Sequence, residues 1–431
     1  MSRAVALRGA LPPGTQAVAA GTVVLGGASY LHLALAGHSL PTRDMAGVSV
    51  LWTILMSVGI GLFFPIEQEL TRIVAARAVR GQGAGPVLRR AALLTTGVLV
   101  PVLGLMAAAA RPLAGLLFHG DRALLAALGA AFAAMACCYL TRGILAGLGR
   151  FGAYGTQLGL DGSLRVLLAV GLAVAGPHSA LAFSLVLTAA PLLALLATLP
   201  VTVRAARPGP PIGWSRLLGG LGLLICSTLL AQWMVSAAVV SVQLLDAADV
   251  DLIAALLSAL VLARVPIFVF GALQASLLSG LASWAAQGQH AAFTALLRRA
   301  ALAVALLALA LGLPALALGP WLIRLLFAAP SVLTRADFLW LALGTFCYLL
   351  AMVLGQGLIV LHRHRVQLAC WALGTAVLVA VTLLPGGLAT LVCLAYAAGT
   401  AATVAGMLLG LLRRPGAPER AGEAPRTLDA V

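Results

Sequence analysis

The chain has 431 residues, of which 62% are hydrophobic and 9% are charged, and its mean hydropathy is +1.08. A soluble globular domain carries about 25% charged residues, so this composition excludes that class and indicates an integral membrane protein. The formal net charge of +15 does not indicate a nucleic-acid partner, because the basic residues are dispersed between apolar segments.

Twelve apolar segments approach the length of about 20 residues that a helix needs to cross a bilayer. In chain order they cover residues 15–36, 45–65, 91–110, 123–146, 154–176, 179–201, 217–244, 251–272, 300–318, 338–361, 367–384 and 389–412. The first segment is longer than the apolar core of a signal peptide, so we expect it to remain as the first helix. The pattern predicts an all-α polytopic membrane protein with about 12 transmembrane helices.

The arginines predict how these helices are oriented. With the N-terminus in the cytoplasm, 20 arginines fall in cytoplasmic segments and five on the opposite side. Cytoplasmic loops of membrane proteins carry an excess of basic residues. We therefore expect a multi-pass protein of the cell membrane with both termini in the cytoplasm.

Short strings recur between the two halves of the chain. LRRAAL begins at residue 88 and again at 297, and CY begins at 138 and again at 347, both 209 residues later; QL begins at 157 and returns after 210. Six segments per half return the chain to the same side, which predicts two parallel repeats related by an axis along the membrane normal.

The expected domains are an N-terminal six-helix bundle over residues 1–208, a C-terminal six-helix bundle over 209–412, and a disordered cytoplasmic tail over 413–431. Residues 204–214 contain three prolines, so this stretch is expected to be a semi-rigid linker on the cytoplasmic face.

Charged residues inside the apolar segments are the candidate substrate-binding residues. Arg264 has no carboxylate three or four residues away, and an uncompensated arginine in a membrane costs about 2.5 to 3.5 kcal/mol. It is expected to face a water-filled cavity or an anion; snorkelling and a distant ion pair are the alternatives. Asp161 and Arg165 are four residues apart and can pair, which leaves self-neutralisation and a substrate or proton-coupling role equally open. Arg142 lies near the cytoplasmic end of its segment, where snorkelling alone would explain it.

Glu67, Glu69 and Arg72 follow the second segment and are candidates for coupling or gating. If the helix continues past Pro65, Glu69 and Arg72 are three residues apart and can pair; the alternative is an interfacial ion pair without a transport role. The matching part of the second half, around Gln274, has no acids, which indicates a role confined to one half.

Nothing in the chain indicates catalysis. The cysteines lack the spacings of metal or disulfide sites, and the phosphate-binding GxxxxGK[ST] pattern is absent. We therefore expect no enzymatic activity, no metal and no cofactor.

Two stretches, PIEQELTR at residues 65–72 and TRGILAGLGRFGAY at 141–154, resemble polysaccharide biosynthesis proteins of the Wzx type. These proteins belong to the multidrug/oligosaccharidyl-lipid/polysaccharide (MOP) flippase superfamily, which also contains the MATE exporters and the lipid II flippases. The resemblance implies two six-helix bundles around a central cavity that opens alternately to each side. It also implies transport of a polyprenyl-pyrophosphate-linked sugar from the inner to the outer leaflet.

The residues agree with this resemblance in one respect. Arg142, Arg165 and Arg264 all lie between the membrane middle and the cytoplasmic end, where guanidinium groups could receive a pyrophosphate. The expected partners are the polyprenyl-pyrophosphate-linked sugar and membrane lipids, without nucleic acid. A polysaccharide polymerase and glycosyltransferases are further candidate partners.

Three other functions stay open. A MATE-like exporter of cationic drugs should present carboxylates in its cavity, and Asp161 is the acid that lies clearly within a segment. A membrane glycosyltransferase would use an outer acid such as Asp44 or Asp246 as base, but it would not need duplicated halves and would normally have larger outer loops. A purely structural role is the remaining alternative, and the intramembrane charges count against it.

Overall fold

The computed structural model describes residues 14–245, 250–327 and 332–412, and every regular element within these ranges is a helix. Twelve of the described segments are long and apolar enough to cross a membrane, which confirms the predicted all-α class and the number of spans. The protein is therefore a multi-pass membrane protein.

The helices follow one another in two sets of similar order. The first half contains α2 (Thr15–Ser39), α3 (Thr42–Ile54), the short π-helix η1 (Leu55–Gly59), α4 (Ile60–Val79), α5 (Gly85–Ala108), α6 (Ala110–Phe118), α7 (Arg122–Gly147), α8 (Phe151–Ala175) and α9 (Ala180–Ala205). The second half contains α10 (Trp214–Leu218), α11 (Leu221–Leu245), α12 (Val250–Ala286), α13 (His290–Phe327), α14 (Arg335–Val360), α15 (His364–Thr382) and α16 (Leu388–Leu412).

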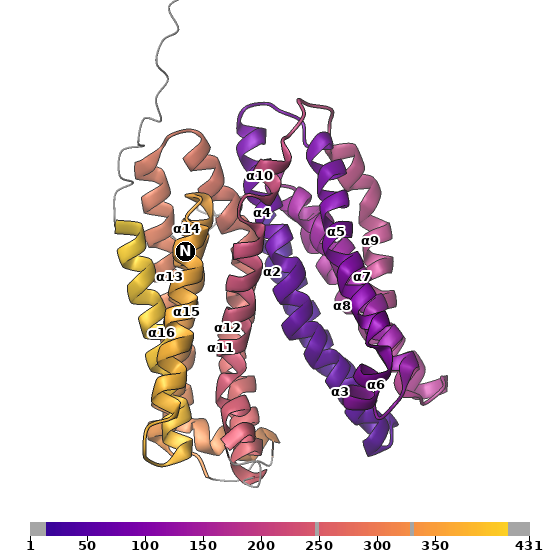
Figure 1. The fold of residues 1–431 in the computed structure, drawn as a ribbon, viewed down its shortest axis with the longest axis vertical. Helices are drawn as coiled ribbons and strands as arrows, with labels where there is room; N and C mark the ends of the chain where they lie inside the picture. The colour runs from indigo at the N-terminus through magenta and orange to yellow at the C-terminus, as the bar shows by residue number, and fades with distance from the viewer. Residues whose placement is uncertain (1–13, 246–249, 328–331, 413–431) are drawn as a thin grey trace, which may run out of the picture.

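Figure 1 shows the two halves as bundles that lie side by side. They meet where α2 and α4 of the first half pack against α11 and α12 of the second. The turn after α4, the turn after α14 and the connection from α9 to α10 lie at the same end of the molecule, which we call the linker side. This is the side that the arginine distribution predicts to be cytoplasmic.

The second membrane segment extends further than its hydropathy predicts. The helical path through α3, η1 and α4 continues past Pro65 and ends only at Val79, so the predicted end at residue 65 is wrong. A proline is tolerated inside a membrane helix because neighbouring helices and local π-turns satisfy the backbone groups that it frees. As a result, Glu67, Glu69 and Arg72 lie within the helix and not after it.

The register of the repeat differs from the one that the short strings predict. Helices α7 and α14 have 26 residues each, and their starts and ends are both 213 residues apart. The turns that follow make matching backbone hydrogen bonds: Arg150 N donates to Leu145 O and Arg363 N to Leu358 O, both at 2.8 Å. The CY strings, 209 residues apart, are therefore about one helical turn out of structural register. In so Leu- and Ala-rich a chain, short matches arise without structural equivalence.

Glycines let α2 and α8 approach closely. A Cβ atom on Gly155 of α8 would lie 2.3 Å from the backbone carbonyl of Ala17 on α2, and one on Gly21 would lie 2.4 Å from the carbonyl oxygen of Gly155. About two helical turns further along α8, a Cβ on Gly162 would lie 2.9 Å from the backbone of Leu25. This is the small-residue packing typical of membrane helices, and it fixes how α8 faces α2.

The linker between the halves is attached to the first bundle. Arg77 Nη2 donates to the carbonyl oxygen of Pro210 at 2.6 Å, and Gly85 N donates to that of Arg207 at 2.8 Å. The guanidinium of Arg90 lies 5.4 Å from the ring centre of Trp214. The proline-rich stretch predicted as a linker therefore runs along the end of α4 and the start of α5.

Candidate functional site

The two stretches that carry the family resemblance pack against each other. A Cβ on Gly147 of α7 would lie 2.5 Å from Val74 Cβ on α4, and one on Gly143 would lie 2.8 Å from Leu70 Cβ. Because both positions lack a side chain, α7 lies directly on α4, and the neighbouring Arg142 is held inside the bundle.

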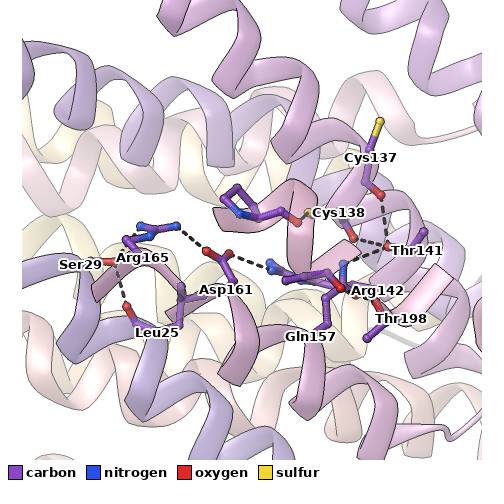
Figure 2. Close-up of polar contacts among 12 residues, drawn as sticks. Leu25, Ser29, Cys137, Cys138, Thr141, Arg142, Gln157, Asp161, Arg165 and Thr198 are labelled. Carbon is purple, nitrogen blue, oxygen red and sulfur yellow. Dashed lines mark hydrogen bonds and ion pairs between the residues drawn. The ribbon is translucent and has the colours of Figure 1, made fainter. Parts of the chain in front are cut away.

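A chain of charges crosses the first bundle, as Figure 2 shows. Asp161 accepts from Arg165 on the same helix, with Nη2 to Oδ1 at 2.9 Å, and from Arg142 on α7, with Nη2 to Oδ2 at 3.4 Å. Arg165 Nη1 also donates to Ser29 Oγ on α2 at 3.1 Å. The predicted pair of Asp161 and Arg165 is therefore confirmed.

Arg142 joins this cluster and does not snorkel. Its side chain is buried, with 6% of the residue exposed, compared with 3% for Asp161 and 4% for Arg165. The sequence could not predict this contact, because Arg142 and Asp161 are 19 residues apart and lie on different helices.

Polar groups on the same face of α8 extend the cluster toward α4. Tyr154 Oη donates to Glu67 Oε1 at 2.8 Å, and Gln157 Nε2 donates to Thr141 Oγ1 at 3.2 Å. Glu67 is 2% exposed, and its second oxygen has no hydrogen-bond partner. Sequence reasoning missed Tyr154, although its spacing of seven residues from Asp161 places both on one helical face.

A cavity of about 150 Å³ adjoins the charge cluster. Its lining includes Arg142, Asp161, Arg165 and Ser29 together with apolar side chains, and all of the lining residues belong to the first half. This cavity therefore lies within the first bundle, and the substrate-binding role of the arginines stays a prediction. A volume of this size matches about five water molecules or one phosphate-sized group.

The cavity carries an excess of positive charge. Two guanidinium groups and one carboxylate line it. The Nε atoms of Arg142 and Arg165 have no hydrogen-bond partner. His32, fully buried on α2 with its ring 6.1 Å from that of Phe183, also has both ring nitrogens without a partner. The sequence analysis did not single out this histidine, although a polar residue inside the first apolar segment could have indicated a functional position. His32 is not among the lining residues, so the guanidinium groups of Arg142 and Arg165 are the donors that favour an anion in this cavity.

Glu69 and Arg72 form a second cluster on the linker side. Arg72 Nε donates to Glu69 Oε2 at 2.9 Å, which confirms their predicted pairing, and Arg72 Nη1 lies 2.8 Å from His362 Nε2 of the second half. These residues do not line the cavity of the first bundle. Arg264 is on α12, but its side chain falls outside the described residues, so its role stays a prediction.

Comparison with solved structures identifies the fold. No protein-family model matches the sequence, and no curated protein matches it. Among solved structures, a mutant of the MATE transporter VcmN from Vibrio cholerae has a TM-score of 0.78 at 14% identity, covering 95% of this chain and 97% of that one. An outward-facing multidrug resistance MATE transporter of the MOP superfamily has a TM-score of 0.77 at 15% identity, covering 92% and 95%.

The eukaryotic MATE transporter AtDTX14 has a TM-score of 0.74 at 13% identity, covering 93% of this chain and 94% of that one. The chain therefore has the fold of the MATE transporters of the MOP superfamily along nearly its whole length. At this level of identity the likeness shows the fold, and the transported substrate has to be argued from the residues.

Proposed function

We propose that this protein is an alternating-access flippase that moves a polyprenyl-pyrophosphate-linked oligosaccharide or polysaccharide precursor from the inner to the outer leaflet. One observation carries the proposal: two buried guanidiniums share a single carboxylate beside a cavity. The fold supplies the two bundles that such a mechanism needs.

An anion would complete the charge balance of the cavity lining, which contains two guanidiniums and one carboxylate. Buried charges are stable when they are paired and hydrogen-bonded, and Asp161 neutralises one of the two arginines that contact it. The unpartnered Nε atoms of Arg142 and Arg165 are donors that a phosphate oxygen can accept from, and guanidinium groups pair well with phosphate.

The cavity is large enough for the charged end of such a substrate. Its volume is about 150 Å³, which has room for a phosphate-sized group beside Arg142 and Arg165. In the proposed mechanism the first bundle therefore recognises the charged headgroup, and the sugar and lipid portions stay outside this cavity.

A MATE-like exporter of a small molecule is the second candidate. It is supported by the fold and by the same cavity volume, which suits a small solute. A cationic solute fits less well, because the carboxylate of Asp161 is already neutralised by Arg142 and Arg165.

Transport in proteoliposomes tests the proposal. The purified protein is reconstituted with a fluorescent polyprenyl-pyrophosphate-linked sugar, and the fraction reached by a membrane-impermeant quencher is followed over time. Protein-dependent flipping with the lipid chemically unchanged supports the proposal, and a changed lipid indicates a transferase. Flux of a cationic dye without lipid flipping would replace the flippase with the exporter.

Removing either cavity arginine is expected to slow flipping. Arg165→Gln and Arg142→Gln each delete charged hydrogen bonds worth about 1.5 to 3 kcal/mol, which corresponds to a rate lower by about tenfold to a hundredfold. Arg89→Gln, on the exposed face of α5, is the matched control and should transport normally. Arg264→Ala belongs in the same series and is expected to abolish export with normal insertion. Unimpaired flipping by both cavity variants would exclude the first bundle as the headgroup site.

A further inference from the structure

A polar contact joins the two halves on the linker side. Arg72 of α4 is buried, with 8% of the residue exposed, and its Nη1 lies 2.8 Å from Nε2 of His362, in the turn between α14 and α15. Glu69 holds the other face of the same guanidinium, with Arg72 Nε to Glu69 Oε2 at 2.9 Å. The arginine is thus oriented by its own helix and directed at the opposite half.

The backbone of His362 adopts a conformation that L-residues rarely take. Its φ is +58°, in the left-handed region, where glycine is the usual residue. In the equivalent turn of the first half, which makes the same hydrogen bonds, the position is Gly149 with φ +67°. A histidine at a position where the first half has a glycine strains the backbone locally, and backbone strain of this kind is concentrated at functional positions.

We propose that Glu69, Arg72 and His362 form a latch that holds the linker side of the two halves closed and that opens when His362 is protonated. This inference rests on the alternating-access function proposed above. In the latched state, the neutral imidazole accepts a hydrogen bond from Arg72 through Nε2. A protonated imidazole has no free acceptor and adds a second positive charge beside the guanidinium, so the contact is lost.

The surroundings of His362 determine whether the latch opens at low or at high pH. Partial burial of the ring, and then the charge of Arg72, lower the pKa of His362. The imidazole is therefore neutral above this lowered pKa, where the latch is formed, and the latch is lost as the pH falls through it. The titratable and charged groups that face the ring are Arg72 of α4, which is itself paired with Glu69, and His364 of α15, whose ring lies 6.1 Å away. His362 is exposed, so protons from solution reach it.

The distance between the halves on the linker side tests the latch. Spin labels are placed at the exposed positions Arg150 and Arg365, as Arg150→Cys and Arg365→Cys, after Cys226→Ser removes the exposed native thiol. The distance distribution is then measured by pulsed EPR in lipid, between about pH 8 and about pH 5, the range in which imidazoles titrate. We expect the short distance at the higher pH and a longer one as the major population after acidification.

Three substitutions separate the latch from other effects. His362→Gly should give the long distance at both pH values and should still fold, because Gly149 occupies the equivalent turn. His362→Gln keeps an acceptor near the position of Nε2 but does not titrate, so the short distance should persist in acid. His364→Gln should leave the pH response of the parent protein intact.

A parent protein whose distances do not change with pH would overturn the latch, as would a His362→Gln variant that still responds or a His364→Gln variant that no longer does. None of these results depends on a substrate. Failure of the latch therefore leaves the flipping assay standing, and failure of flipping leaves the distance measurement interpretable.

Discussion

Asp161→Asn is expected to destabilise the protein by about 3 to 5 kcal/mol, the usual cost of removing one partner from a buried ion pair. Asp161 is 3% exposed and is the carboxylate that both Arg142 and Arg165 contact. Its loss leaves both guanidiniums inside the bundle without the carboxylate that forms salt bridges with them. The measurement is the free energy of unfolding in mixed micelles, together with the amount of protein inserted in the membrane.

A second substitution shows whether charge is the cause. Asp161→Asn combined with Arg165→Gln leaves one buried guanidinium instead of two, so the double variant should be more stable than Asp161→Asn alone. If the two substitutions were simply additive, the destabilisation would come from lost packing and not from an unpaired charge. If Asp161→Asn had no effect, the buried cluster would not be held by its carboxylate.

Gly155→Ala is expected to cost about 3 kcal/mol, at the upper end of the range for overpacked sites. The new Cβ would lie 2.3 Å from the backbone of Ala17, and backbone cannot move aside as a flexible side chain does. Helices α2 and α8 would have to separate, which would also lengthen the contact between Arg165 and Ser29. We therefore expect reduced transport together with the loss of stability.

Gly152→Ala, three residues earlier on the same helix, is the matched control. A Cβ at this position meets no atom within 4 Å, so the substitution should be neutral or stabilise by up to about 1 kcal/mol through higher helix propensity. Thermal unfolding of both variants measures the difference. Equal stability of the two variants would show that α2 and α8 are not held at their close separation.

The proposed transport mechanism divides recognition and control between two places in the molecule. The cavity beside Arg142 and Arg165 lies within the first bundle, whereas the contact between Arg72 and His362 joins the bundles at the linker side. A substrate bound in the first bundle can favour one arrangement of the halves only if its affinity differs between the two arrangements. The glycine contacts of α7 with α4 provide a physical connection, because they join the helix that carries Arg142 to the helix that carries Arg72.

The sequence by itself determined the class of protein and the pairs that form within single helices. A bilayer leaves no water for backbone groups, so each crossing must be a helix of about 20 apolar residues, and hydropathy is enough to find it. Asp161 with Arg165 and Glu69 with Arg72 could be predicted because residues three or four apart share a helical face.

The tertiary structure alone decided which helices bring their charges together. Arg142 meets Asp161 across 19 residues of chain, and Arg72 meets His362 across 290, and hydropathy says nothing about how one helix is rotated toward another. That rotation is set by close approaches at positions such as Gly147 and Gly155, where a missing side chain fixes one packing face. The cavity beside Arg142 and Arg165 is also a product of tertiary packing, because its lining comes from several helices of the first half.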